Sequence, residues 1–558
     1  MRIFLTIALV ALFTSGQAQR QQTLTLDDTL RGSITPERVW WDLNYYHLNI
    51  TVKPETKSLE GEVEIRYTVL NPSQVLQVDL QPPLKITKIT QDGDSLGFTK
   101  KGNNVYLVSL KKAQQKGKSE AVVVSYTGKP VEARNPPWQG GLQWTYDKNG
   151  TAFIATSCQG LGASVWWPCK DHMYDEPDSM LMSVTVPKGL MNISNGRLRK
   201  TIENSDGTKT FQWFVGNPIN NYGVNINVAD YVHFSDTIRG EKGVLDMNYY
   251  VLSYNLEKAK EQFKQAKLMM RAFEYWFGPY PFYEDGFKLV EAPYLGMEHQ
   301  SSVTYGNDYG NGYRGRDLSG SGWGLKWDYI IIHESGHEWF ANNITYKDVA
   351  DMWIHESFTT YSETLYVDYH FGAEAGNEYT YGIRQNIRND RPIIGTYNVN
   401  KSGSGDMYPK GSNMIHTLRH SIDNDQLFRN ILRGMNKTFY HHTVTTQEIE
   451  NYISKQAGFN YGKVFDQYLR TTQIPKLEYY VKGNVLHHRW TNCVDGFNLP
   501  LALRNGNNKI KINSTDKWQQ TKITKEQRAL FDKAFIEKMY YVTAESTSGE
   551  GAQLERKR

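Results

Sequence analysis

The stretch IIHESGHEWF, at residues 331–340, contains His333 and His337 four residues apart, with Glu334 directly after the first histidine. The residues before it, 327–332, are mostly apolar and aromatic, which is typical of a buried helix start. Residues i and i+4 of a helix share a face, so both imidazoles can bind one tetrahedral metal ion. Glu334 is then placed to hold a metal-bound water rather than the metal. A histidine pair in a helical core would give the same pattern, so this HExxH motif suggests a metal site without establishing it.

A second helical stretch begins near residue 351 and supplies a third candidate ligand, Glu356, after a gap of 18 residues from His337. A catalytic zinc site needs three protein ligands and one open position for water. His333, His337 and Glu356 meet that count and predict one Zn²⁺ per chain. Glu363 lies seven residues further on, two turns along the same face. It either accepts a hydrogen bond from the far nitrogen of a ligand histidine or is a solvated surface charge.

The spacing of apolar residues changes twice along the chain. From about residue 40 to 237 they mostly alternate with polar residues, which predicts a large antiparallel β domain. After Pro475 the strand pattern returns. Between these parts, short apolar strands such as 287–290 come early, and helical spacing then predominates. The predicted helices cover 256–273, 329–343, 355–370, 410–422, 425–436 and 446–457.

These patterns predict a multidomain α+β fold. The expected parts are an N-terminal antiparallel β domain at 20–237, a mainly helical catalytic domain at 238–475, and a small C-terminal β domain at 476–558. The tail from Ser546 is rich in glycine, serine and charge, and we expect it to be mobile.

Residues 301–327 contain seven glycines among serine, asparagine, aspartate and tyrosine, without an apolar period. The segment is too long for an ordinary connection inside a compact domain. It is therefore either disordered or a functional loop.

Composition excludes several classes of protein. The 558 residues are 39% hydrophobic and 22% charged, which fits neither a disordered chain nor a membrane bundle. A net charge of +4 is too small for a polyanion binder, so we expect no nucleic-acid partner. Beyond the N-terminus, no stretch approaches the roughly 20 apolar residues of a membrane span, so no stable membrane insertion is expected.

The N-terminal residues 1–18 match a signal peptide. Arg2 provides the positive start, residues 3–13 form an apolar run, and small residues occupy positions 16 and 18. We expect cleavage near Ala18 and export to the periplasm or the exterior. An N-terminal strand is the alternative.

Three cysteines are too few for a disulfide framework. Cys158 and Cys169 are close enough in sequence to pair, which would leave Cys493 over. Three free thiols are the preferred interpretation, although the spacing fixes no geometry.

Further motifs surround the metal signature. FGPYPF lies at 277–282, GMEHQ at 296–300, YPKG at 408–411 and WPCKD at 167–171. Together with HExxH and its glutamate 18 residues later, they resemble the FGxYPF, GxMEN, YxKG and FPCxDEP motifs of the M1 family of zinc aminopeptidases, in the gluzincin group. The resemblance runs from about residue 45 to 475.

The resemblance implies a thermolysin-like catalytic domain that removes N-terminal residues from peptides. Glu334 would act as the general base, and Tyr408 would donate a hydrogen bond to the oxyanion. A peptide amine is largely cationic at neutral pH, and Glu298 would anchor it. The family's substrate-lining positions correspond here to Gln159, Gly296 and Met297.

The chain also departs from the family pattern. His299 replaces an asparagine, His355 an asparagine and Ser357 a glycine, while the DEP sequence is displaced to 175–177. No long helical domain follows residue 476. None of these changes removes a ligand or the base. They concern the pocket shape, the specificity and the closure of the cleft. Lone histidines are expected to be structural or surface groups, namely His299, His355, His441 and His442.

The predicted function is a zinc-dependent aminopeptidase acting on peptides with a free N-terminus. A zinc endopeptidase would share the metal site and the base, and Glu298 is the feature that discriminates against it. A non-catalytic peptide-binding protein of the same fold is the other alternative. The sequence indicates neither the preferred N-terminal residue nor the oligomeric state.

Overall fold

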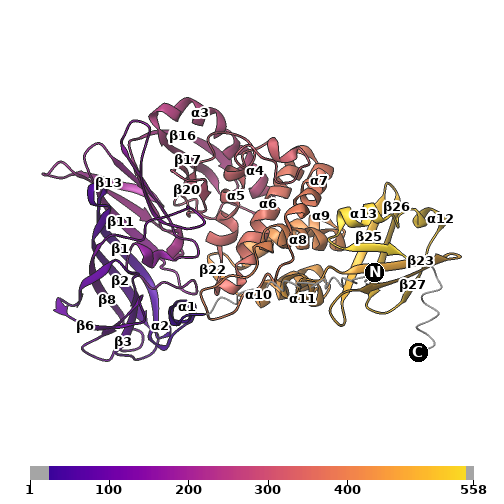
Figure 1. Cartoon of the computed structure of the whole chain (residues 1–558), viewed down its shortest axis with the longest axis horizontal. Helices are drawn as coiled ribbons and strands as arrows, with labels where there is room; N and C mark the ends of the chain where they lie inside the picture. The colour runs from indigo at the N-terminus through magenta and orange to yellow at the C-terminus, as the bar shows by residue number, and fades with distance from the viewer. Residues whose placement is uncertain (1–23, 548–558) are drawn as a thin grey trace, which may run out of the picture.

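The structure, a computed structural model, describes residues 24–547. The predicted signal peptide and the end of the predicted tail lie outside these residues. Three regions follow one another along the long axis of the molecule (Figure 1). An N-terminal β region, coloured indigo to magenta, is followed by a helical middle region and then by a small β region in yellow. The predicted α+β fold class is confirmed.

The N-terminal region is built on an eight-stranded sheet in which buried and exposed side chains alternate. Leu48, Ile50 and Val52 of the central strand are all buried, as the period-two pattern predicts. One neighbouring pair, β1 with β11, is parallel, so the sheet is not purely antiparallel. Several other strands lie between β1 and β11 in the sequence. This long connection allows β11 to run in the same direction as β1. The strand order is β13 (Arg197–Glu203), β14 (Lys209–Val215), β11 (Ser179–Val186), β1 (Trp41–Lys53), β2 (Ser58–Val69), β8 (Ser119–Gly128), β4 (Lys85–Gln91) and β5 (Asp94–Ser95).

Two smaller sheets complete this region. The four-stranded sheet contains β12 (Met191–Ser194), β15 (Ile226–Ala229), β10 (Ala152–Ser157) and β9 (Gly141–Tyr146). The three-stranded sheet contains β3 (Val75–Asp79), β7 (Val105–Ser109) and β6 (Gly97–Lys101). Gln159 follows the end of β10, so the position of this side chain depends on the four-stranded sheet.

The middle region opens with a five-stranded sheet. Its order is β16 (Tyr231–Gly240), β17 (Gly243–Leu252), β18 (Phe287–Glu291), β20 (Val303–Tyr305) and β19 (Gly296–Met297). The domain boundary expected at residue 237 falls inside β16, which pairs along its whole length with β17. The hairpin therefore belongs to one sheet, and the change of region comes before Tyr231.

Helices fill the rest of the middle region. The predicted helix over 256–273 is two helices, because the regular hydrogen-bond pattern is interrupted at Phe263 and Lys264, where the Lys264 amide donates to the carbonyl three residues back. The helix predicted over 329–343 ends at Gly336, and an irregular turn follows. Two helices, α7 and α11, were not predicted. The helices are α3 (Leu256–Gln262), α4 (Gln265–Phe277), α5 (Tyr329–Gly336), α6 (Trp353–Phe371), α7 (Ala373–Ile383), α8 (Pro409–Ile422), α9 (Asp425–Thr438), α10 (Thr446–Ala457) and α11 (Gly462–Arg470).

The C-terminal region shares its hydrophobic core with the helices. Leu477 and Trp490 lie in the same buried cluster as Leu469 of α11. Ser546, where we expected a mobile tail to begin, is the last residue of β28. The elements are β23 (Lys476–Lys482), β24 (Val485–Thr491), β27 (Gln519–Lys522) and β28 (Thr543–Ser546) in one sheet, β25 (Asn498–Asn505) with β26 (Asn508–Thr515), and helices α12 (Lys525–Arg528) and α13 (Lys533–Met539).

Two further predictions concern the described residues. All three cysteines are free thiols, and Cys158 and Cys169 are both buried. Within residues 24–547, no helix combines the length and the apolar character that a membrane crossing requires.

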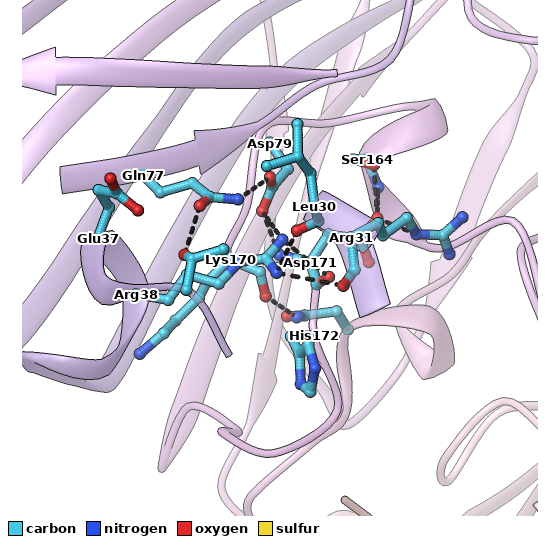
Figure 2. Close-up of polar contacts among 12 residues, drawn as sticks. Leu30, Arg31, Glu37, Arg38, Gln77, Asp79, Ser164, Lys170, Asp171 and His172 are labelled. Atoms are coloured by element: carbon cyan, nitrogen blue, oxygen red, sulfur yellow. Dashed lines mark hydrogen bonds and ion pairs between the residues drawn. The ribbon is translucent and has the colours of Figure 1, made fainter. Parts of the chain in front are cut away.

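A buried polar cluster joins the N-terminal helix α1 (Leu26–Gly32) to the β region (Figure 2). Arg38 is fully buried and donates to the backbone oxygens of Leu30 and Ser33, at 2.9 Å each. Its guanidinium also binds Asp79 at 2.7 Å. Since the last carbonyls of a helix lack intrahelical donors, Arg38 satisfies the end of α1 while it neutralises a buried carboxylate.

Candidate active site

Three predicted metal ligands converge from two helices. His333 and His337 lie on α5 and its end, Glu356 lies on α6, and all three side chains are buried. Oε2 of Glu356 lies 3.9 Å from Nε2 of His333 and 3.5 Å from Nε2 of His337. This oxygen is buried and accepts no hydrogen bond from the described residues. Two imidazole nitrogens and an unsatisfied carboxylate oxygen facing one another fit a metal ion such as zinc.

The far nitrogen of each imidazole is held by another group. Nδ1 of His333 lies 2.6 Å from Oε1 of Glu363, so the contact that the sequence left open is present. Tyr379 in turn donates to Oε2 of Glu363 at 2.5 Å. Nδ1 of His337 lies 3.0 Å from the carbonyl oxygen of Phe340. These contacts fix both rings with Nε2 directed at Glu356, which is how the surroundings of a zinc site orient its histidines.

The turn after Gly336 makes the second of these contacts. Phe340 departs from helical backbone angles, and the turn brings its carbonyl back toward His337. In a continuing helix this carbonyl would instead accept from the amide four residues later. Gly336 also permits close packing, because a Cβ at this position would lie 2.5 Å from Oγ of Ser362 on α6. The two ligand-bearing helices therefore approach more closely than a side chain at this position would allow.

Glu334 lies among other carboxylates. Candidate ligand atoms of Glu334, Glu298 and His337 all lie within 4.8 Å of one another. Burial raises the pKa of Glu334 well above its usual range, and the neighbouring charges of Glu298, Glu356 and Glu363 raise it further. The site therefore brings together four carboxylates, those of Glu298, Glu334, Glu356 and Glu363.

Glu298 is positioned by two groups from the N-terminal region. Gln159 donates from Nε2 to Oε1 of Glu298 at 2.7 Å and to Oε1 of Glu356 at 2.9 Å. The Tyr222 hydroxyl donates to the same oxygen of Glu298 at 3.0 Å. Sequence reasoning missed Tyr222, since no motif marks it and its role depends on the contact between two regions.

Gly296 and Met297 form β19, the edge strand beside Glu298. A Cβ on Gly296 would lie 2.5 Å from Cγ2 of Ile330 and 3.3 Å from Cγ of Glu334. Glycine at this position thus lets the edge strand lie directly against helix α5.

Tyr408 lies at the N-terminal end of α8, with its ring centroid 6.2 Å from that of His333. Burial and the nearby carboxylates, first Glu356, raise its pKa well above the usual value, so the phenol keeps its proton and can donate. Gly411 holds α8 close to α6, because a Cβ there would lie 1.9 Å from Oγ of Ser357. Ser357 donates to the Met407 carbonyl at 2.7 Å, so this departure from the family pattern fastens the Tyr408 segment to α6.

These side chains line one cavity of about 400 Å³. All ten predicted site residues lie on its wall, and no lysine or arginine among the described residues does. His299 and His355 are buried and do not line it. Sequence reasoning missed most of the other lining residues, which come from several segments: Pro137, Trp138, Leu295, Tyr313, Leu318, Tyr329, Ile330, Thr360, Ile383, Asn386 and Pro409.

The glycine-rich segment 301–327 begins with strand β20 and continues as a loop beside this cavity. Asn307 donates from Nδ2 to the carbonyls of Gly310 and Gly312, at 2.9 Å each, and to Oδ1 of Asp328 at 3.0 Å. Asp328 also caps the first turn of α5. Disorder, one of the two alternatives that the sequence left open, does not fit, because the segment is tied to the start of the ligand-bearing helix and its Tyr313 and Leu318 line the cavity. A role as a functional loop stays a prediction.

Comparisons with known proteins agree with this geometry. The Peptidase family M1 domain matches residues 261–468, and the Peptidase M1 N-terminal domain matches residues 43–222. A "Probable aminopeptidase 1" from Saccharolobus solfataricus is 21% identical over 74% of this chain and 52% of its own length. The "Puromycin-sensitive aminopeptidase" of Caenorhabditis elegans is 23% identical over 77% of this chain and 47% of its own. The chain thus spans about half the length of these curated relatives.

A solved M1 zinc metallopeptidase from Deinococcus radiodurans shares the fold. Its TM-score is 0.64 at 21% sequence identity, with 78% of this chain and 95% of that chain covered. The two family models match most of the N-terminal β region and most of the helical region that holds the cavity. This chain belongs to peptidase family M1.

Proposed function

We propose that this protein is a zinc-dependent aminopeptidase that removes N-terminal residues from peptides. The observation that carries this proposal is the carboxylate of Glu298, held by Gln159 and Tyr222 in the same cavity as the three candidate ligands. A buried carboxylate on the wall of a cavity suits a cationic amine. It would hold the first peptide bond of a substrate at the metal site.

The residues of the chain divide the chemistry among them. His333, His337 and Glu356 would hold one zinc ion, which lowers the pKa of a water to about 7 and polarises a carbonyl. Glu334 takes the proton of the attacking water and passes it to the leaving nitrogen. Tyr408 donates a hydrogen bond to the oxygen on which negative charge develops.

A comparison of free and blocked substrates tests the proposal. We expect leucine p-nitroanilide to be hydrolysed, and N-acetyl-leucine p-nitroanilide to be cleaved at least about a hundredfold more slowly, because acetylation removes the charge that Glu298 binds. Equal rates on both would favour the zinc endopeptidase. Binding of peptides without hydrolysis would favour the non-catalytic alternative. Metal content and inhibition by a chelator would be measured on the same preparation.

We also propose that residues 1–18 direct export and are removed near Ala18. The support is the sequence pattern alone. Expression of the full chain in a bacterial host, followed by fractionation and N-terminal sequencing, tests it. Mature protein that begins near Gln19 in the periplasm or medium is the expected result, and an intact Met1 in the cytoplasm would contradict it.

A further inference from the structure

Two arginines of the glycine-rich loop lie beside aromatic side chains that line the cavity. Arg314 and Arg316 are both exposed, and neither forms an ion pair with a carboxylate of the described residues. Each lies over an aromatic side chain that lines the cavity: Arg314 is 5.5 Å from the Trp138 ring and Arg316 is 5.5 Å from the Tyr313 ring. Stacking thus holds both charges beside two residues of the cavity wall.

The backbone of Arg314 is also fixed by a hydrogen bond within the loop. Its backbone amide donates to Oδ1 of Asn307 at 2.9 Å, and Asn307 is itself bound to Asp328. Trp138, its aromatic partner, belongs to the N-terminal region and is 56% exposed. Arg314 also lines a second hollow of about 530 Å³, which shares Leu295 with the catalytic cavity. Arg314 therefore lines the second hollow and also contacts Trp138 on the wall of the catalytic cavity.

The edge strand gives the path that a bound peptide would take. β19 is the last strand of its sheet and is paired with β20 on one side only, so its other edge can receive an extended peptide. If the peptide amine binds Glu298 and the peptide pairs with β19, the chain runs toward Leu295, since residues 295–298 line the cavity and His299 is buried outside it.

The length of the peptide then determines which residue of the cavity wall lies beside its C-terminus. Three residues of extended chain span roughly 10 Å, so a tripeptide that starts at Glu298 ends about level with Leu295. Leu295 is the residue shared with the hollow that Arg314 lines. The four glutamates of the cavity repel a carboxylate. The second hollow is lined by Arg314 together with Glu291 and Asp308, and among the described residues Arg314 forms an ion pair with neither acid, so its charge is available to a ligand. A zwitterionic short peptide therefore fits the site in one orientation.

We propose that Arg314, with Arg316 beside it, binds the C-terminal carboxylate of short peptides, so that the preferred substrates are about three residues long. The inference rests on the proposed aminopeptidase function and deepens it. Arginine suits the task because its planar fork can bind a carboxylate through two hydrogen bonds. In longer peptides, the third residue presents an uncharged amide at this point and loses the contact.

The test compares Leu-Gly-Gly with its C-terminal amide. We expect the wild-type protein to favour the free acid in kcat/KM by about tenfold through a lower KM, as for a hydrogen bond to a charged group. Arg314→Ala should remove the preference by raising KM for the acid alone, and Arg314→Lys should keep part of it. The contact is exposed, so added salt should weaken the preference.

Arg199→Ala is the matched control, since Arg199 is another exposed arginine stacked on a ring, 5.3 Å from Phe214 in the N-terminal sheet. It should leave the preference unchanged. A wild-type protein that cleaves leucine p-nitroanilide but treats acid and amide alike would overturn this inference alone, as would an Arg314→Ala protein that keeps the full preference. Failure to cleave either leucine p-nitroanilide or the tripeptides would instead overturn the proposed function itself.

Discussion

Two buried regions of this molecule gather several carboxylates, and they differ in the source of the balancing positive charge. In the cluster around Arg38, three aspartates each have a cationic side chain beside them, and Figure 2 labels two of these aspartates, Asp79 and Asp171. Arg38 binds Asp79 at 2.7 Å, Arg31 lies 3.3 Å from Asp171, and Lys170 binds Asp175. In the catalytic cavity, four glutamates meet without a lysine or arginine among the described lining residues.

This difference in counter-charge distinguishes the Arg38 cluster, which is structural, from the cavity, which we propose to be catalytic. Burying a charge without a partner costs folding free energy. A cluster in which the chain supplies its own counter-charges avoids this cost and needs no added cation. A chain that leaves carboxylates uncompensated keeps a site ready for external cations. In the cavity, a zinc ion and the amine of a substrate would be those cations.

The largest effect is expected from Glu334→Gln in the uncompensated region. Turnover of leucine p-nitroanilide should fall by at least about a thousandfold, because the amide cannot accept the proton of the attacking water. Zinc content should stay near one per chain, since Glu334 is not among the proposed ligands. Steady-state kinetics and elemental analysis on the same sample would check this, and retention of substantial turnover would remove Glu334 from the mechanism.

The next effect is expected from Tyr408→Phe. Loss of one donor to a developing oxyanion costs roughly a hundredfold or more in kcat. KM should change little, because the phenol acts on charge that appears only in the transition state. If kcat is unchanged while KM rises, Tyr408 binds substrate and does not stabilise the oxyanion.

A smaller effect is expected from Glu298→Ala. It should raise KM for free-amine substrates by roughly tenfold or more, the loss expected for an ion pair in a buried site. Use of N-acetylated substrates should change little, so the discrimination between free and blocked amines narrows. Discrimination equal to that of the wild type would move the amine site elsewhere.

The smallest effect on catalysis is expected from the compensated region. Asp79→Asn leaves the Arg38 charge buried without its carboxylate and should lower the free energy of unfolding by about 3 kcal/mol. The kcat/KM of the folded protein should not change. Glu60→Gln is the control, because it breaks an exposed ion pair with Lys53 and should cost at most about 1 kcal/mol in a denaturant titration. Equal losses for the two variants would show that the cluster contributes no more than a surface pair.

The site residues that lie close together in sequence could be predicted, because helix geometry determines which of them share a face. A spacing of four residues places His333 and His337 on one face, and a spacing of seven does the same for Glu356 and Glu363. The change from period two to helical spacing likewise predicted the three regions. The boundary at residue 237 was less accurate, since strands on either side of a domain boundary show the same alternation.

What only the tertiary structure decided are the contacts between distant segments. Tyr222 reaches Glu298 across 76 residues of sequence, and Trp138 meets Arg314 from another region of the molecule. The turn that brings the Phe340 carbonyl to His337 also depends on the packing of α5 against α6. Such contacts follow from how sheets and helices pack, and a packed interface leaves no periodic signal in either segment. The sequence by itself therefore determined the family and the candidate ligand set. Packing determined the groups that hold these ligands in place and the walls of the cavity.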